Sequence, residues 1–196
     1  MGGEPPSFTG AVLAGGASSR MGTDKAFIEV DGRTLVAGAA RALTGAGASS
    51  VLVIGGDEAA LRSLGLDARP DDEPGEGPLG GILTALRLAA DDVVVILACD
   101  MPAIDAESVT SILAALSAAP SADVVVPVVS ERRQFLTAAY RQRAAAHLGE
   151  AYAAGERAPR RAVLGLDGVE VIGLDDHRLG DVDRPEDLRR YAQRQV

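Results

Sequence analysis

The stretch Leu13 to Lys25, LAGGASSRMGTDK, decides the fold, because it follows an apolar segment of strand length and places glycines and two basic residues on one loop. Gly15 and Gly16 lack side chains, so backbone N–H groups there can approach phosphate oxygens. Arg20 offers a planar fork of donors, and Lys25 supplies a compact positive charge. A strand followed by such a loop indicates an α/β protein that binds a polyphosphate.

This loop carries neither of the two common phosphate-binding motifs. It lacks the GxxxxGK[ST] spacing of a P-loop, and it lacks the GxGxxG spacing of a Rossmann dinucleotide site. The motifs that would best support an ATPase or a dehydrogenase function are therefore absent from this loop.

Apolar segments of strand length alternate with segments of helical periodicity along the chain. Such alternation indicates βαβ units and a mainly parallel sheet with helices on both faces. An Asp31-Gly32 pair predicts a tight turn. The expected strands are 8–13, 51–54, 93–98, 124–129, 135–140 and 169–174, and the expected helices are 34–44, 79–89, 106–118, 141–154 and one that begins at 185.

Length and composition indicate one globular domain. The 196 residues are 47% hydrophobic and 24% charged, and the net charge of −9 argues against binding to nucleic acid or to a membrane surface. No apolar run reaches the roughly 18 to 20 residues that span a bilayer, and the N-terminal residues do not resemble a signal peptide. With Cys99 as the single cysteine, we expect a cytoplasmic protein in a reducing compartment.

Polar or glycine-rich loops follow or adjoin three of the expected strands. They are AGGASSR after the first strand, PDDEPGEGPLGG before the helix at 79–89, and ACDMP after the strand at 93–98. In open α/β sheets, ligands bind outside the carboxyl ends of the strands. We therefore expect these loops to converge on one crevice.

Four stretches of the chain resemble the molybdenum cofactor guanylyltransferases, the MobA family of nucleotidyltransferases. They are LAGGASSRMGTDK, GPLGGILTAL at 77–86, CDMP at 99–102 and DVDRPEDL at 181–188, in the family's order. The resemblance implies a Rossmann-like, three-layer α/β domain of the nucleotide-diphospho-sugar transferase type. It also implies an enzyme that transfers GMP from GTP to molybdopterin carrying molybdenum and releases pyrophosphate, with Mg²⁺ as cofactor. Proteins that deliver or receive the cofactor would be further partners.

The resemblance assigns roles to single residues. Leu13, Ala14 and Gly15 would contact the nucleotide, Lys25 its phosphates, and Asp71 the guanosine end. A plain solvated turn is the alternative for Asp71 and its neighbour. The GPLGG stretch would begin a helix with little side-chain bulk, so that a flat purine can approach, and this stretch favours guanine over cytosine. The expected nucleotide-binding residues are therefore Leu13, Ala14, Gly15, Gly16, Arg20, Lys25, Asp71, Gly77, Pro78, Leu79 and Asp100.

Nucleotidyl transfer joins two anions, so charge neutralisation and positioning dominate it. We expect Arg20, Lys25 and Asp100 to be the catalytic residues. A carboxylate at a strand end can hold Mg²⁺, and Asp100 fits that role, whereas Asp105 is better placed to cap the following helix. Asp183 is the expected second metal ligand.

Asp181 supports the metal site in this hypothesis, and here the chain departs from many guanylyltransferases, which have Asn at positions 181 and 183. VIGGD at 53–57 likewise stands where the family often has an Asn near the nucleotide.

Residues 131–161 hold seven Arg against three Glu, a local charge of +4 that leaves −13 for the remainder. These arginines are either solvated helix faces or a basic wall for an anionic substrate. On the second interpretation, Arg132, Arg133, Arg160 and Arg161, together with Arg157 and Asp181, would bind the acceptor. We thus expect one nucleotidyltransferase domain, 1–196, with a flexible start at 1–7, a nucleotide-binding half at 8–129 and an acceptor-binding half at 130–196.

Two other functions stay open at this stage. A related nucleotidyltransferase could use CTP or another triphosphate, with molybdopterin or a sugar phosphate as acceptor. A nucleotide-binding protein without turnover is the second alternative. Cys99 is interpreted as a small buried residue rather than a nucleophile.

Overall fold

The computed structural model describes residues 6–15, 24–171, 174, 178–182, 186–188 and 191. The helices of this described part are α1 (Leu35–Gly45), α2 (Glu58–Ser63), α3 (Pro78–Leu88), α4 (Ala106–Ala118), α5 (Ala144–Ala153) and α6 (Pro159–Ala162), with a 3₁₀ turn η1 (Lys25–Phe27). The strands are β1 (Phe8–Leu13), β2 (Glu29–Val30), β3 (Arg33–Thr34), β4 (Ser50–Ile54), β5 (Asp67–Arg69), β6 (Val93–Ala98), β7 (Val124–Val129), β8 (Arg132–Arg133), β9 (Thr137–Arg141) and β10 (Gly168–Val171).

The main sheet follows the order β10-β7-β9-β6-β1-β4-β5, and β8 pairs with β7 at its side. Pairing is parallel between β1 and β4, β1 and β6, β4 and β5, and β7 and β10. Strand β9 runs antiparallel between β6 and β7. The prediction of a mainly parallel sheet is confirmed, with β9 and the short β8 as antiparallel members.

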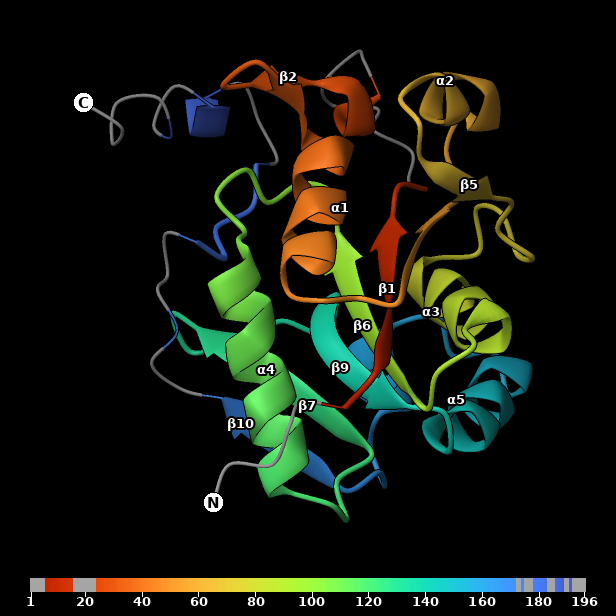
Figure 1. Cartoon of the computed structure of the whole chain (residues 1–196). Coiled ribbons are helices and arrows are strands. Elements are labelled where there is room, and N and C mark those ends of the chain that lie inside the picture. The colour runs from red at the N-terminus through yellow and green to blue at the C-terminus, as the bar shows by residue number, and fades with distance from the viewer. Residues whose placement is uncertain are drawn as a thin grey trace.

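Helices cover both faces of the sheet, as the alternating pattern predicts (Figure 1). Successive residues of β1 serve opposite faces: Val12 packs with α1 and α4, while Leu13 packs with α3 and α5. Burying one large aliphatic side chain stabilises the fold by about 1.5–3 kcal/mol, so both faces contribute to stability. The central strands β1 and β6 are held in place from both sides.

The hairpin of β2 and β3 confirms the turn that was predicted at Asp31-Gly32. The two residues have φ angles of 53° and 74°, the positive values that a type I′ turn requires. Besides the two strands of this hairpin, five short elements were not predicted from the sequence, namely α2, β5, β8, α6 and η1. They span between two and six residues each, too few for a periodic pattern to be visible.

The chain after position 130 differs most from expectation. The predicted strand at 135–140 lies at 137–141, and the predicted helix at 141–154 begins only at Ala144. Arg141 continues the strand, because its N–H donates to the Asp123 carbonyl at 2.9 Å. The predicted strand at 169–174 corresponds to β10 at 168–171; positions 172–173 lie outside the described residues, and Leu174 is not in a strand. Residues 186–188 are helical, as predicted for the C-terminal segment. No helix in the described part is long and apolar enough to cross a membrane.

Candidate active site

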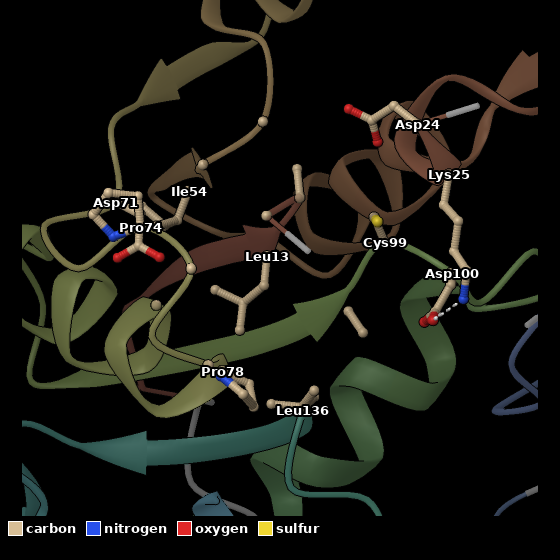
Figure 2. A pocket seen from close by; sticks show the side chains of 18 residues that line it. Leu13, Asp24, Lys25, Ile54, Asp71, Pro74, Pro78, Cys99, Asp100 and Leu136 are labelled. Carbon is tan, nitrogen blue, oxygen red and sulfur yellow. Dashed lines mark ion pairs between the residues drawn. The ribbon is translucent and has the colours of Figure 1, made fainter. Parts of the chain in front are cut away.

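The carboxyl ends of β1, β4 and β6 border a cavity of about 550 Å³. The loops after β1, before α3 and after β6 all contribute to it, so the expected convergence is confirmed for the described residues (Figure 2). Its lining residues are Leu13, Ala14, Gly15, Asp24, Lys25, Ile54, Gly55, Gly56, Asp71, Pro74, Gly75, Gly77, Pro78, Gly81, Ala98, Cys99, Asp100 and Leu136.

The start of the glycine loop is fixed to both neighbouring strands. The Ala14 N–H donates to the Ile54 carbonyl at 3.0 Å, and the Cys99 N–H donates to the Leu13 carbonyl at 3.3 Å. These backbone hydrogen bonds hold the segment at the cavity, which is lined by Leu13, Ala14 and Gly15. Gly16 and Arg20, also predicted to bind the nucleotide, lie outside the described residues.

Gly55 and Gly56 belong to the cavity but were not among the predicted site residues. Gly55 has a φ of +77°, and a Cβ atom on it would lie 3.1 Å from Cα and 3.2 Å from N of Gly15. A side chain at this position would therefore push against the glycine loop. The glycine pair directly after a buried strand was the available signal.

Gly55→Ala is expected to raise the KM for the nucleotide about tenfold, because the added methyl group displaces Gly15 while the positive φ strains the backbone. Steady-state kinetics would measure this. The matched control is Gly65→Ala, since Gly65 has a φ of +76° with nothing within 4 Å of its Cβ position. Equal nucleotide KM values in the two variants would contradict the steric role of Gly55.

Lys25 and Asp100 meet at one end of this cavity. The Lys25 Nζ lies 3.5 Å from Oδ2 of Asp100, and their side chains are 19% and 23% exposed. Lys25 opens the 3₁₀ turn η1, which the Asp24 side chain caps by accepting from the Ala26 N–H. Asp100 follows the buried strand β6, so a cation and a carboxylate are held together in a partly dry site.

Asp71 lies at the other end of the cavity from Lys25 and Asp100 (Figure 2). Its neighbour Asp72 instead accepts two hydrogen bonds from Arg87, at 2.7 and 2.8 Å, and does not line the cavity. The two consecutive carboxylates thereby have different surroundings: Asp71 lines the cavity, and Asp72 pairs with Arg87 of α3.

The first turn of α3 borders the cavity beside Asp71. Gly77, its N-cap, and Pro78, its first residue, both line the cavity. Leu79, the second residue of α3, was also predicted to bind the nucleotide. Its side chain is 0% exposed in the core between α3 and the sheet, and it does not line the cavity.

A second cavity of about 500 Å³ adjoins the first. Both are lined by the same four residues at their junction, Pro78, Ala98, Asp100 and Leu136. Basic residues from β8 and from the segment around α6 line the second cavity, so the basic-wall interpretation agrees with their placement. These residues are Arg133, Arg157, Arg160 and Arg161, with Asp181 beside them; Arg132 is not a lining residue.

Three of these arginines are engaged with glutamates. Arg133 pairs with Glu170, Arg157 with Glu76 at 2.9 Å, and Arg161 with Glu156. The hydrogen bond from Arg161 is the main reason that the pKa of Glu156 falls to about 2, so this pair stays ionised at neutral pH.

Arg160 is exposed and has no ion-pair or hydrogen-bond partner within the described part of the chain. Its guanidinium is therefore the one in this wall that can bind an anion without first breaking such a pair.

Asp100 is the carboxylate best placed to hold a magnesium ion, because it lines both cavities. Mg²⁺ prefers one or two carboxylates together with phosphate oxygens and waters, and Asp100 offers a partly exposed carboxylate to both cavities. The Val182 N–H donates to the Asp100 carbonyl at 2.9 Å, so the segment carrying Asp181 passes beside it. Asp183 lies outside the described residues, and within the described ones no three His, Cys, Asp or Glu side chains group as a metal cluster.

The structural roles predicted for Cys99 and Asp105 are confirmed. Cys99 is 8% exposed, and burial raises the pKa of its thiol to about 12, so the thiol stays protonated and unreactive near neutral pH. Asp105 caps α4 by accepting from the Ser108 N–H at 2.9 Å, and Asp100 is not needed for that cap.

Comparison with known proteins relates the chain to a family of nucleotidyltransferases. Residues 10–169 match the model of the MobA-like NTP transferase domain. A probable molybdenum cofactor guanylyltransferase of Deinococcus radiodurans is 36% identical over 188 residues, which cover 95% of each chain. A molybdenum cofactor guanylyltransferase of Pseudomonas putida is 32% identical over 182 residues, or 91% of this chain and 94% of that protein.

Solved structures agree on the fold. Molybdopterin-guanine dinucleotide biosynthesis protein A from Archaeoglobus fulgidus superposes with a TM-score of 0.77 at 23% identity, over 95% of this chain and 98% of the other. The 2-C-methyl-D-erythritol 4-phosphate cytidylyltransferase of Thermus thermophilus superposes with a TM-score of 0.71 at 19% identity, over 95% of this chain and 98% of the other. The Rossmann-like, nucleotide-diphospho-sugar transferase fold is thereby confirmed.

Proposed function

The chain belongs to the MobA-like NTP transferase family, and from that premise we propose that it transfers GMP from GTP to the terminal phosphate of molybdopterin carrying molybdenum. The products are molybdopterin guanine dinucleotide and pyrophosphate. Relatives that are named as molybdenum cofactor guanylyltransferases and align over more than nine tenths of the chain support this assignment. The cytoplasmic location stays a prediction from the sequence.

The observation that carries the proposal is the junction of the two cavities at Asp100. A transferase with two anionic substrates needs a separate place for each and a common boundary where the reacting phosphates meet. The glycine-lined cavity suits the nucleotide, and the arginine-lined cavity suits the acceptor. The α-phosphate of GTP, which is the reacting centre, would lie at their boundary.

The chain's own residues act by positioning and by neutralising charge. An oxygen of the acceptor phosphate forms a bond to the α-phosphorus of GTP, while the bond from that phosphorus to the bridging oxygen of the β-phosphate breaks. Pyrophosphate leaves with the electron pair. Lys25, at the Asp100 end of the cavity, would stabilise negative charge on the phosphates. No covalent intermediate with the protein is required.

Asp100, together with Asp183, is proposed to hold Mg²⁺. When bound, the ion would neutralise charge on the phosphate oxygens. Asp181 lines the acceptor cavity and would support this end of the site. Arg20 is proposed to contact the phosphates from the glycine loop.

Arg160→Glu is expected to raise the KM for the acceptor about tenfold or more and to leave the KM for GTP unchanged. The reason is that Arg160 lines only the acceptor cavity and has no partner within the described residues. Initial rates at varied acceptor and fixed GTP, and the reverse, would separate the two constants.

Arg41→Glu is the control for the same change of charge, because Arg41 is exposed on α1 and lines neither cavity. Equal rises of both KM values in Arg160→Glu would speak against separate cavities for the two substrates.

The proposed reaction is tested by incubating the protein with Mg²⁺, purified molybdopterin and each of the four nucleoside triphosphates, followed by mass analysis. The expected product carries one GMP unit and appears with pyrophosphate. A cytidylylated product would assign CTP as the substrate instead. GTP binding without pyrophosphate release would indicate a nucleotide-binding protein without turnover.

A further inference from the structure

Thr84 is a buried polar residue on the nucleotide side of α3. It is 1% exposed, and its hydroxyl reaches the loop that precedes the helix. The Oγ1 atom accepts from the Asp72 N–H at 3.1 Å and lies 3.0 Å from Oδ1 of Asp71. Because a carboxylate can only accept, the single hydroxyl proton of Thr84 points to Asp71.

This hydrogen bond leaves the two oxygens of Asp71 in different situations. Oδ1 accepts from Thr84 and also from the Glu73 N–H at 3.1 Å. Oδ2 lies 3.9 Å from the Cβ position of Gly81, and within the described residues no hydrogen bond reaches it. Asp71 lines the cavity, and the absence of a side chain on Gly81 keeps the space beside Oδ2 open.

The orientation of the cavity places the nucleoside near Asp71. Lys25 and Asp100, the cation and the carboxylate suited to phosphates, lie at the opposite end (Figure 2). A triphosphate bound there leaves the base end of the nucleotide near Asp71. A fixed carboxylate oxygen at that end favours a base that presents two adjacent hydrogen-bond donors.

We propose that Thr84 is a positioning residue that determines base selection, because its hydroxyl aims the Asp71 carboxylate at guanine; this rests on the proposed function. Guanine presents two adjacent donors, its N1–H and its 2-amino group, to a carboxylate. Adenine N1 and cytosine N3 are acceptors without a proton, so a carboxylate repels them. A site built to receive a donor rejects the base that lacks it, because the buried acceptor is then left unpaired.

Thr84→Val removes the hydroxyl and keeps the shape of the side chain. The expected result is a fall of about tenfold in the ratio of GTP to ATP affinities, since the carboxylate loses its fixed direction. Inosine triphosphate, which lacks the 2-amino group, is expected to approach GTP in affinity in this variant. Thr84→Ser, which restores the hydroxyl, is expected to retain the selectivity of the unchanged chain.

Thr9→Val is the matched control. Thr9 is 0% exposed near the amino end of β1, and its hydroxyl donates to Oδ2 of Asp91 at 2.7 Å, whereas the cavity lies at the carboxyl end of this strand. It repeats the pairing of a buried threonine hydroxyl with a partly exposed carboxylate, but away from the nucleotide cavity. We expect it to lower stability and to leave the GTP to ATP ratio unchanged.

Calorimetric titration of GTP, ITP, ATP and 2′-deoxy-GTP into each variant measures these ratios without the acceptor. An unchanged ratio of GTP to ATP affinities in Thr84→Val would overturn the proposal. An equal loss of affinity for all four nucleotides would overturn it as well, and so would a change confined to the ratio of GTP to 2′-deoxy-GTP affinities. If Thr84→Val does not fold, Asp71→Asn is the second test and must lose the same preference. Failure of the unchanged chain to release pyrophosphate in the complete reaction would instead refute the proposed function.

Discussion

Asp100→Asn is expected to lower kcat about a thousandfold, the upper part of the range for removing one preorganised electrostatic contact to a transition state, such as an oxyanion-hole donor. The carboxylate stands at the junction of the two cavities, 3.5 Å from the Lys25 ammonium group. The amide keeps the shape of the side chain but removes the negative charge that is proposed to hold Mg²⁺. Pyrophosphate release under saturating substrates is the measurement.

Asp105→Asn is the control for this variant. Asp105 lies five positions further along the chain, caps α4 and pairs with Arg178 at 2.8 Å, and it lines neither cavity. Asn is also a good N-cap, so this variant should keep both its stability and its turnover. Turnover by Asp100→Asn at the rate of the unchanged chain would refute the assignment of Asp100.

Lys25→Gln is expected to lower kcat/KM for GTP about a hundredfold, because the proposed phosphate ligand loses its charge in a partly buried site. The KM for the acceptor should change little, since Lys25 lines the first cavity and not the second. Kinetics with each substrate varied in turn would measure both effects.

A chemical readout is available because Lys25 is the only lysine of the chain. An acylating reagent selective for amines can therefore modify only Lys25 and the α-amino group, and mass spectrometry separates the two products. Bound GTP is expected to protect Lys25 and not the chain terminus. Equal modification with and without GTP would show that Lys25 does not contact the nucleotide.

The nucleotide side of the site could be predicted from the sequence because its residues stand at strand ends. Leu13 is the last residue of β1 and Asp100 stands two residues after the end of β6, and parallel neighbours bring their carboxyl ends to one edge. Lys25 could be placed there too, since it closes the same loop. The alternation of strands and helices was enough to predict which edge carries the chemistry.

Gly55 and Leu136 were missed because their place depends on the order of strands in space. Gly55 becomes a neighbour of Gly15 only because β4 pairs with β1. Leu136 reaches the junction because β9 inserts antiparallel between β6 and β7, a long-range pairing that local periodicity cannot reveal.

For the acceptor side, the sequence predicted a cluster of arginines but not how their side chains are arranged in space. Arg132 and Arg133 are adjacent in the sequence and equal in charge, yet only Arg133 lines the second cavity, since successive residues of a strand face opposite ways. Composition also could not distinguish Arg160 from the arginines that pair with Glu76 and Glu156. The pair of Arg157 with Glu76 joins segments that only the folded chain brings together, whereas Arg161 and Glu156 are five positions apart in the sequence.

A crystal structure with Mg²⁺ and a GTP analogue that cannot be cleaved between its α- and β-phosphates tests the central claim most directly. The account predicts the α-phosphate beside Lys25 and Asp100 and the guanine beside Asp71. A triphosphate bound outside this cavity, or one bound in the reverse direction with its base at Asp100, would contradict it.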